Sequence, residues 1–376
     1  MANHKTILMI NVHEDDVLCF RKEVILDLAE QGYKMVLLYP VGTRSKEIIC
    51  DNIIVENLKI DRHGCNPLKD FALLMRCRKA IKKYQPTMVL LYTIKPNIYG
   101  ALAASSLCVP FINNITGIGS SMNGKETVLQ AFVTFLYRIA LKKTRHVFFQ
   151  NAENRDMFLV KKICTKSNSS VIPGSGVDLK RFAYVEPVAS DKIVFNYIGR
   201  VMRSKGIIEY IEAAKKIIVK HPECEFNILG FIENDEKELT SLLDKEQKNG
   251  HLIYRGAQSD IKPWIARSDA IILPSKYGEG MSNVLLETAA IGRSLITTRI
   301  PGCACLVEND NGFLFEPGNT EELISCIESF LTLSREERTE MGRRSRDLVE
   351  RKYSREIVVH AYRKIVNEID YNGGDK

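Results

Sequence analysis

A glycine-bounded loop rich in cations is the first candidate site in the sequence. The segment Gly199-Arg-Val-Met-Arg-Ser-Lys-Gly206 follows a predicted strand over residues 192–198 and precedes a helix expected to begin near Ile207. Free backbone N–H groups and the dipole at a helix N-terminus attract anions. Arg200 and Lys205 add two positive charges, one suited to a forked phosphate contact and one to a point contact. The loop therefore predicts a phosphate site, although basic loop residues also serve simply to solvate a surface.

Two glutamates eight residues apart form a second candidate site. They lie in Lys276-Tyr-Gly-Glu-Gly-Met-Ser-Asn-Val-Leu-Leu-Glu287, which follows a predicted strand over residues 269–273. A helix is expected to begin near Ser282, so Glu279 lies on the loop at the carboxyl end of the strand, where open α/β sheets bind ligands. Glu287 lies one to two turns into the helix, where it can accept hydrogen bonds from hydroxyls such as those of a ribose. Taken alone, the pair is equally compatible with two surface glutamates beside an amphipathic helix.

Short apolar runs alternate with helical patterns along most of the chain, which predicts parallel sheets with crossover helices. In the first half, the predicted strands cover residues 5–12, 34–39, 87–92, 110–114, 146–149 and 169–172. The predicted helices run from Asp16 to Gln31, Leu68 to Tyr84, Asn97 to Ser105 and Thr127 to Lys142.

A domain boundary is predicted at Ile172-Pro-Gly-Ser-Gly-Val-Asp178, because several turn formers occur together there. A second series of strands follows, over residues 192–198, 225–230, 251–254, 269–273 and 294–297. From Ser334 onward the sequence has the pattern of two helices that separate near Tyr353-Ser354. A chain of 376 residues is long enough for two α/β domains of this kind.

Composition narrows the class of protein. Apolar residues make up 45% and charged residues 26%, which is ordinary for a globular chain and argues against disorder. No apolar run reaches the roughly 18 residues that span a bilayer, and the first residues lack the pattern of a signal peptide. The ten cysteines are scattered without a Cys-x-x-Cys pair, which is typical of reduced thiols in a cytoplasmic protein.

Positive charge is concentrated in the first half of the chain. Residues 70–145 carry 11 basic and 2 acidic side chains, while the whole chain has a net charge of +7. One domain is therefore expected to present a basic face to an anionic partner. Nucleic acid, a membrane surface and a phosphorylated substrate all fit that description.

A phosphate loop after the first strand of a domain, followed later by the Glu-x7-Glu unit, resembles the donor half of the GT-B glycosyltransferases. More narrowly, the chain is similar to the retaining family 4, also called glycosyltransferase group 1. Four further stretches carry the resemblance: Phe20-Arg-Lys-Glu-Val-Ile-Leu-Asp-Leu-Ala-Glu-Gln-Gly32, Ile172-Pro-Gly-Ser-Gly-Val-Asp178, Asp269-Ala-Ile-Ile-Leu-Pro-Ser275, and Pro301-Gly-Cys303 with Asn311-Gly-Phe313. The resemblance implies two Rossmann-like domains facing a cleft, over residues 1–175 and 190–353, with a final helix, 354–376, that packs back on the first.

The same resemblance implies roles for individual residues. Arg200 and Lys205 would hold the donor diphosphate and stabilise charge on the leaving group, and Glu287 would bind the ribose hydroxyls. Glu279, with the backbone amides of Gly280 and Met281, would contact the donor sugar. No metal and no cofactor beyond the nucleotide-sugar donor is implied, because the cations supply the electrostatic stabilisation. The reaction would retain the anomeric configuration, and the donor is expected to be UDP-linked hexose or N-acetylhexosamine.

Two loops of the first half are expected to help build the acceptor site. They are Tyr92-Thr-Ile-Lys-Pro-Asn-Ile-Tyr-Gly100 and Asn113-Asn-Ile-Thr-Gly-Ile-Gly119, with Lys95, Asn97 and Thr116 as the candidate residues. The first loop resembles enzymes that extend polyprenyl-diphosphate-linked saccharides in bacterial capsule, O-antigen or glycoprotein assembly. Many relatives have a histidine in each loop, whereas Tyr92 and Thr116 stand at those places here.

A lipid-linked acceptor agrees with the basic stretch. The predicted helix over 127–142 combines several large apolar residues with Lys142, Lys143 and Arg145 at its end, a composition that suits docking on an anionic membrane. The expected location is therefore cytoplasmic and peripheral, on the inner face of the cell membrane.

Other classes of protein remain as alternatives. A nucleotide-sugar epimerase or binding protein of the GT-B type would share the donor half but would not need the basic first domain. A nucleic-acid-binding protein is suggested by charge alone, since the sequence has no recognisable aromatic-basic module. No nucleic-acid partner is therefore expected.

Overall fold

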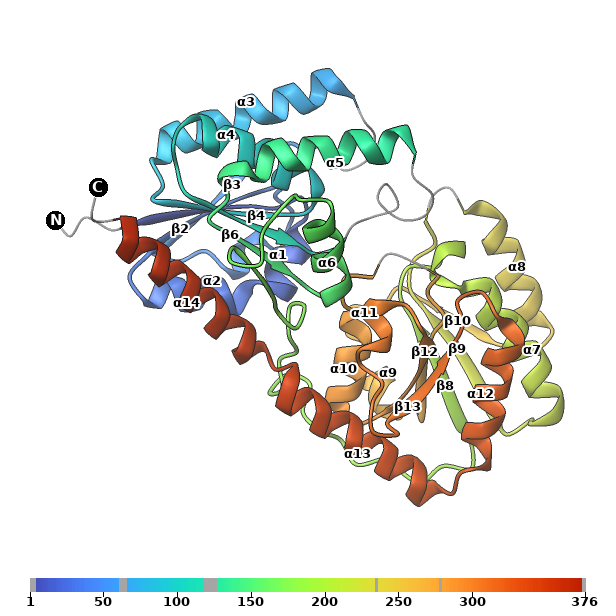
Figure 1. Cartoon of the computed structure of the whole chain (residues 1–376). Coiled ribbons are helices and arrows are strands. Elements are labelled where there is room, and N and C mark those ends of the chain that lie inside the picture. The colour runs from blue at the N-terminus through green and yellow to red at the C-terminus, as the bar shows by residue number, and fades with distance from the viewer. Residues whose placement is uncertain (1–4, 61–65, 118–126, 234–235, 277–278, 374–376) are drawn as a thin grey trace. The chain divides into compact units, whose positions relative to one another are not determined.

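The computed structural model in Figure 1 describes residues 5–60, 66–117, 127–233, 236–276 and 279–373. The chain forms two compact units, one of Met1–Ser175 with Arg355–Lys376 and one of Gly176–Ser354. No helix among the described residues has the length and apolarity needed to cross a membrane.

The first unit is built on a parallel sheet of seven strands in the described part of the chain, in the order β3-β2-β1-β4-β5-β6-β7. The strands are β1 (Thr6–Ile10), β2 (Lys34–Tyr39), β3 (Ile53–Asn57), β4 (Met88–Tyr92), β5 (Phe111–Ile115), β6 (His146–Phe149) and β7 (Ser169–Val171). The central strands β1, β4 and β5 are almost wholly buried, as expected for a parallel sheet covered on both faces.

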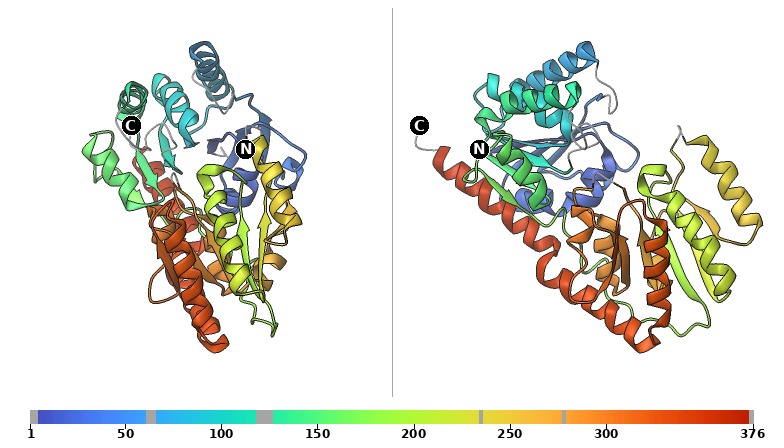
Figure 2. Two further views of the ribbon diagram at one scale, coloured as in Figure 1. Left: turned by 90° about the vertical axis from the view of Figure 1, so that its right-hand side faces the viewer. Right: turned by 45° about the vertical axis from the view of Figure 1, so that its right-hand side comes forward.

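Helices cover both faces of this sheet, as Figures 1 and 2 show. One face carries α3 (Pro67–Tyr84), α4 (Ala101–Ser106), α5 (Val128–Ala140) and α6 (Ala152–Val160). The other face carries α1 (Glu14–Phe20), α2 (Lys22–Glu30) and α14 (Arg355–Gly373). The described residues of the unit also include the short helical turns η1 (Ser45–Glu47), η2 (Pro96–Gly100, of π type) and η4 (Leu141–Lys143).

The C-terminal helix α14 belongs to the first unit although the whole of the second unit lies between them in the sequence. Val358, Tyr362 and Val366 recur every four residues and are fully buried against the sheet, because residues at this spacing share one helix face. Tyr362 Oη also donates a hydrogen bond to Asn114 Oδ1 on β5.

The second unit repeats the same architecture. Its parallel sheet has six strands among the described residues, in the order β10-β9-β8-β11-β12-β13. They are β8 (Ile193–Ile198), β9 (Cys224–Leu229), β10 (Ile253–Gly256), β11 (Ala270–Leu273), β12 (Ser294–Thr298) and β13 (Gly312–Phe315). One face packs on α7 (Ile207–Lys220), α8 (Lys237–Lys248) and α12 (Thr320–Thr332), and the other on α9 (Lys262–Arg267), α10 (Asn283–Ile291), α11 (Pro301–Ala304) and α13 (Arg335–Lys352).

The structure confirms the predicted α/β class and corrects three details of the sequence-based elements. The helix predicted from Asp16 to Gln31 is two helices, interrupted at Arg21, which has φ −127° and places its guanidinium 5.0 Å from the centre of the Tyr92 ring. The helix predicted to begin at Asn97 begins instead with η2. Strands β3 and β13 were missing from the prediction; each lies at an edge of its sheet and has a single fully buried residue.

Candidate functional site

The two predicted donor segments meet at one place in the sheet of the second unit. Strand β8 is hydrogen-bonded to β9 on one side and to β11 on the other, so the strand order reverses between β8 and β11. Ligands of open α/β sheets bind at the carboxyl ends of the strands at such a point. The loop Gly199–Gly206 leaves β8 there, and the described residues 274–276 and 279–282 follow β11.

Backbone contacts hold the cationic loop against the sheet. Tyr197 Oη donates to the carbonyl oxygen of Arg200 at 2.6 Å, and the Val201 N–H donates to Phe231 at 2.9 Å. Gly206 ends the loop with φ +75° and α7 begins at the next residue, which leaves the first N–H groups of α7 beside the cations. The loop thus has the form of an anion site at a helix N-terminus.

The segment after β11 packs directly on this loop. A Cβ atom at Gly206 would lie 1.9 Å from the carbonyl oxygen of Pro274, so only glycine allows this approach. The Lys276 N–H donates to Ser204 at 3.0 Å, and the Ser282 N–H donates to Gly302 at 2.9 Å. The two segments therefore form one continuous edge of the sheet.

Lys205 and Glu279 form an ion pair across the two segments. Ser275 Oγ donates to the same Glu279 oxygen at 3.2 Å. The side chains of Lys205 and Glu279 are only 19% and 16% exposed, so their attraction is weakly screened by solvent. The structure thus brings together two residues that were predicted to bind neighbouring parts of one donor.

The second predicted cation is also paired with a carboxylate. Arg200 Nη1 lies 2.9 Å from Glu233 Oε1 on the segment after β9, and their side chains are 40% and 28% exposed. Arg203 in the same loop lies 3.4 Å from Glu236. Glutamates therefore contact the cations that are predicted to bind phosphate, and a bound diphosphate would compete with them for these contacts.

An ion pair that the sequence did not suggest connects α7 to the segment after β11. Lys276 Nζ lies 2.6 Å from Glu209 Oε1, and the Glu209 side chain is 8% exposed. Glu209 lies in the first turn of α7, and Lys276 lies shortly before Glu279. The pair therefore links α7, which follows the cationic loop, to the segment after β11. In the sequence, the only sign of this pair was the presence of Lys276 in that segment.

The remaining predicted donor residues lie on the same edge. Met281 is buried, and Gly280 adjoins Gly302, where a Cβ atom would lie 2.8 Å from the Gly280 carbonyl oxygen. Glu287 is half-buried in the second turn of α10, which agrees with its predicted distance from the loop.

Burial raises the pKa of the cysteine thiols of this region, which favours their protonated form. Burial, with a contribution from the Glu279 carboxylate, raises the pKa of the Cys303 thiol well above its ordinary value. Burial also raises the pKa of Cys305 to about 11. Thiols in this form pack as apolar groups and are poor nucleophiles and metal ligands. Among the described residues, no three His, Cys, Asp or Glu side chains are grouped as they would be around a metal ion.

Lys95 lies in a basic pocket of the first unit. Its Nζ is 2.9 Å from Asp70 Oδ1 on α3, and both side chains are largely buried, at 15% and 11% exposure. The pocket has a volume of about 580 Å³ and is open at the carboxyl ends of β2 and β3. Three further cations line it: Lys59, Lys69 and Arg76.

Asn97 and Thr116 occupy different environments. Asn97 is 1% exposed, and its Nδ2 donates to the Asn114 carbonyl oxygen at 2.8 Å while its Oδ1 accepts from Asn113 Nδ2 at 3.0 Å. Thr116 is half-buried in the segment after β5. The side chain of Asn97 is thus engaged in joining η2 to β5, whereas Thr116 lies at the carboxyl edge of the sheet.

Two curated relatives are similar over most of their length. The chain is 29% identical over 276 residues to the Escherichia coli UDP-Gal:alpha-D-GlcNAc-diphosphoundecaprenol alpha-1,3-galactosyltransferase, covering 69% of this chain and 70% of the relative. It is 24% identical over 375 residues to the Campylobacter jejuni N,N'-diacetylbacillosaminyl-diphospho-undecaprenol alpha-1,3-N-acetylgalactosaminyltransferase, covering 94% and 96%.

Solved structures share the two-unit fold. A glycosyltransferase from Rickettsia africae superposes with a TM-score of 0.79 at 22% identity, covering 98% of this chain and 99% of that chain. Anabaena Alr3699/HepE in complex with UDP superposes with a TM-score of 0.76 at 16% identity, covering 97% and 100%. At these identities the likeness establishes the GT-B fold.

Family models match both halves of the chain. Residues 181–348 match glycosyl transferases group 1, and residues 7–151 match the glycosyl transferase 4-like family. The first match contains the Lys205–Glu279 pair and Arg200, and the second contains Lys95, Asn97 and Thr116. The chain therefore belongs to the group 1 and family 4-like glycosyltransferases and is an enzyme of that class.

Proposed function

We propose that this enzyme transfers a hexose or N-acetylhexosamine from a UDP-sugar to a polyprenyl-diphosphate-linked saccharide, with retention of anomeric configuration, during assembly of a bacterial surface polysaccharide or glycan. The observation that carries the proposal is the Lys205–Glu279 pair at the reversal point between β8 and β11, with Arg200 on the same loop. The two similar curated relatives, which are named for diphosphoundecaprenol-linked acceptors, support the acceptor class.

The donor site follows from the chemistry of this edge. Arg200, Lys205 and the first N–H groups of α7 bind the diphosphate, and Glu287 accepts hydrogen bonds from the ribose hydroxyls. Glu279, with the amides of Gly280 and Met281, orients the sugar. Departure of the sugar leaves negative charge on the diphosphate, and the two cations stabilise that charge in the transition state. The donor therefore needs no metal ion at this site.

Ligand binding rearranges the pairs seen in the free enzyme. Arg200 and Lys205 exchange part of their contacts with Glu233 and Glu279 for contacts with the diphosphate. Before the donor arrives, the glutamates occupy contacts of both cations, and the diphosphate must displace them. Once Lys205 turns to phosphate, the Glu279 carboxylate is available to a sugar hydroxyl.

We propose that the acceptor diphosphate binds in the pocket that contains Lys95. Among the described lining residues, Lys59, Lys69, Arg76 and Lys95 supply four positive charges and Asp70 supplies one carboxylate. This pocket opens at the carboxyl ends of the strands of the first unit, the edge at which α/β sheets bind ligands. Thr116 lies on the same edge and would face the acceptor saccharide.

The experiment that tests the donor assignment is a thermal-shift screen against UDP, GDP, ADP and a panel of UDP-sugars. A ligand that binds only the native state raises the unfolding midpoint. We expect a selective shift with UDP and one UDP-sugar that is lost in Lys205→Ala. Lys216→Ala is the matched control, because Lys216 also pairs with a glutamate, Glu321, but lies on the exposed face of α7. Equal shifts in both variants would contradict the assignment.

Transfer itself is measured with a synthetic polyprenyl-diphosphate saccharide and the UDP-sugar found in the screen. The anomeric configuration of the new linkage, read by NMR, tests retention. If the UDP-sugar were instead converted to an epimer without acceptor, the enzyme would be a nucleotide-sugar epimerase and the proposal would be wrong.

Docking on the inner face of the cell membrane is the second part of the proposal. On α5, Val128, Phe132, Phe135 and Ile139 are exposed, at 89%, 54%, 55% and 47%, and form one stripe along the helix. The opposite side of α5 is buried in the core of the unit. An exposed apolar stripe of this kind suits the interface of a bilayer.

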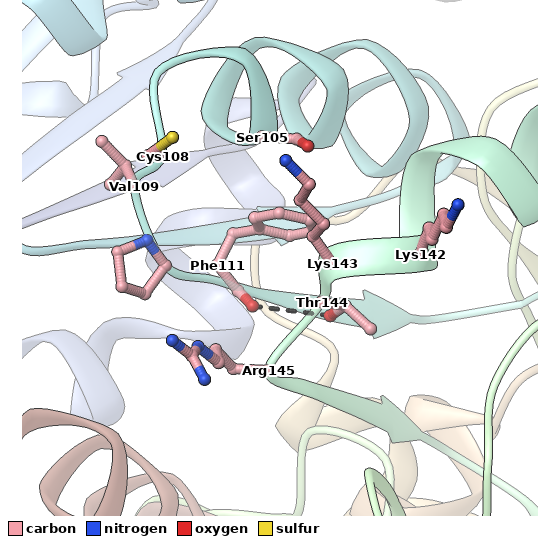
Figure 3. Close-up of a pocket in the computed structure, with 9 residues that line it drawn as sticks. Ser105, Cys108, Val109, Phe111, Lys142, Lys143, Thr144 and Arg145 are labelled. Carbon is pink, nitrogen blue, oxygen red and sulfur yellow. Dashed lines mark hydrogen bonds between the residues drawn. The ribbon is translucent and has the colours of Figure 1, made fainter. Parts of the chain in front are cut away.

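A basic pocket follows the end of this stripe (Figure 3). It has a volume of about 430 Å³, and its lining includes Lys142, Lys143, Arg145 and Ser105. Lys143 extends towards Ser105, and Lys142 points away from it. Cations at the end of an apolar stripe match the charge of anionic lipid headgroups.

Vesicle flotation tests membrane docking. Replacement of Lys142, Lys143 and Arg145 by glutamate should abolish flotation with vesicles that contain phosphatidylglycerol. The control replaces three cations elsewhere in the unit by glutamate: Lys34, Lys46 and Lys166. Unchanged flotation of the first variant, or equal loss in both, would argue against docking through α5.

A further inference from the structure

Thr93, the residue that follows β4, has a backbone conformation that its side chain disfavours. Its φ angle is +67°, in the left-handed region where a β-branched side chain collides with the backbone. In the described part of the chain, five other non-glycine residues have positive φ: Gln85, Cys108, Lys162, Asn309 and Asp310. None of these is β-branched, and Gln85, Cys108 and Lys162 lie at or just beyond the ends of helices.

The hydroxyl of Thr93 is a second unfavourable feature of the same residue. Thr93 Oγ1 is buried and has no hydrogen-bond partner among the described residues. A threonine hydroxyl can donate one hydrogen bond and accept two, and folded proteins rarely bury one without a partner. Glycine at this position would remove both the strain and the unpaired hydroxyl.

The position of Thr93 in the first sheet indicates that it lies at a ligand-binding edge. Strand β4 neighbours β1 at the reversal point of the first sheet, so Thr93 occupies the edge equivalent to that of the donor site in the second unit. The Thr93 carbonyl oxygen accepts a hydrogen bond from the Asn97 N–H at 3.0 Å, and Lys95 lies between these two residues. Strain that persists at such an edge is characteristic of functional residues.

We propose that Thr93 is a substrate-binding residue whose hydroxyl forms a hydrogen bond to a hydroxyl of the acceptor saccharide. This inference rests on the proposed function, and it adds the residue that recognises the sugar next to the diphosphate bound by Lys95. The side chains that cover Thr93 Oγ1 move aside as the acceptor enters, so the contact exists only in the complex. The unpaired hydroxyl then gains the partner that it lacks in the free enzyme.

Three substitutions separate the hydroxyl from the backbone strain. Thr93→Val keeps the shape and the strain but removes the hydroxyl, so kcat/KM for the acceptor should fall about tenfold, the effect of one lost hydrogen bond. Thr93→Ser keeps the hydroxyl and should keep most of the activity. Thr93→Gly removes both, so acceptor kcat/KM should fall as in Thr93→Val while hydrogen exchange of peptides from β4 slows about five- to thirtyfold.

The control is Gln85→Gly, which relieves positive φ (+45°) at the end of α3, away from the site. This substitution should slow the hydrogen exchange of peptides from the end of α3 without changing kcat/KM for the acceptor. Donor hydrolysis without acceptor should be the same in all Thr93 variants. If Thr93→Val or Thr93→Gly transfers sugar as efficiently as the wild type, the assignment of Thr93 is overturned while the proposed function stands. If the wild-type enzyme itself transfers nothing to a polyprenyl-diphosphate saccharide, the proposed function fails and the assignment falls with it.

Discussion

The close packing of Gly206 on Pro274 can be tested by a single methyl group. In Gly206→Ala the new Cβ atom would lie 1.9, 2.5 and 2.8 Å from the carbonyl oxygen, the carbonyl carbon and the Cβ of Pro274. The first two are backbone atoms, which a rotamer change cannot move. The substitution must therefore separate the cationic loop from the segment that carries Glu279.

Gly250→Ala is a control with almost the same backbone conformation. Gly250 has φ +77° against +75° for Gly206, and a Cβ atom there would meet nothing within 4 Å. Alanine in the left-handed region costs about 1–2 kcal/mol at either site. Forcing a methyl group into a packed contact costs about 1–3 kcal/mol more, so Gly206→Ala should lower the free energy of unfolding by about 2–5 kcal/mol in all.

Urea unfolding measures the difference directly. Trp264, the single tryptophan of the sequence, lies in α9 of the second unit. Gly206 and Gly250 belong to the same unit, so tryptophan fluorescence reports on the unit that each substitution changes. In addition, the KM for the donor should rise at least about tenfold in Gly206→Ala and stay unchanged in Gly250→Ala. Equal losses of stability with equal KM values would refute the view that this contact shapes the donor site.

Three further predictions concern single charges. Lys205→Ala and Glu287→Ala should each reduce turnover at least about 100-fold, and near-wild-type rates in both would refute the donor assignment. Glu233→Gln frees Arg200 from its ion pair and should tighten UDP binding about two- to fivefold by calorimetry; weaker binding would show that Glu233 holds Arg200 in the productive position. Burial, with a contribution from Arg155, lowers the pKa of His146 to about 4 from an ordinary 6.5. Between pH 6.5 and 4, the unfolded chain therefore binds a proton at His146 that the folded chain does not bind. The free energy of unfolding should fall by about 3 kcal/mol as the pH drops from above 6.5 to 4. A His146→Gln variant with the same pH dependence of unfolding would contradict this.

The sequence was sufficient for those parts of the fold that depend on local patterns. The buried central strands read as continuous apolar runs, and β2 and β6 have the predicted bounds of 34–39 and 146–149. The edge strands β3 and β13 were not predicted, although each contains three consecutive apolar residues; at the edge of its sheet, each has a single fully buried residue. Arg21, where the two helices are interrupted, contacts Tyr92 at the end of β4, which is distant in the sequence and which no local pattern reports.

The same distinction applies to the proposed donor site. Its two segments were predictable because each combines glycines, cations or glutamates with a strand end and a helix start. The residues that form ion pairs with those segments were not predictable from the sequence. Glu233 follows β9 whereas its partner Arg200 follows β8, and Glu209 lies on α7 whereas its partner Lys276 follows β11. Neither glutamate stands in a motif, so their roles come only from the way β8, β9 and β11 lie side by side.

Asn97, a predicted acceptor residue, takes part in a buried hydrogen-bond network, and this gives a further prediction. It was a candidate acceptor residue by resemblance, yet its amide joins η2 to Asn113 and Asn114 of β5 inside the unit. Asn97→Ala would remove the hydrogen bonds that this amide makes with Asn113 and Asn114, and each buried polar group left without a partner costs about 1–3 kcal/mol. We therefore expect much faster hydrogen exchange of the β5 peptide, with acceptor turnover falling only as the folded fraction falls.

Thr116→Ala is the matched change on the neighbouring segment. Thr116 is half-buried at the end of β5, so its loss should raise the acceptor KM with little effect on the exchange of β5. The opposite result, in which Asn97→Ala leaves β5 protected but abolishes transfer, would mean that Asn97 turns out of its network to bind the acceptor. In that case η2 would be a moving part of the acceptor site, and the hydrogen bonds of Asn97 would describe only the free enzyme.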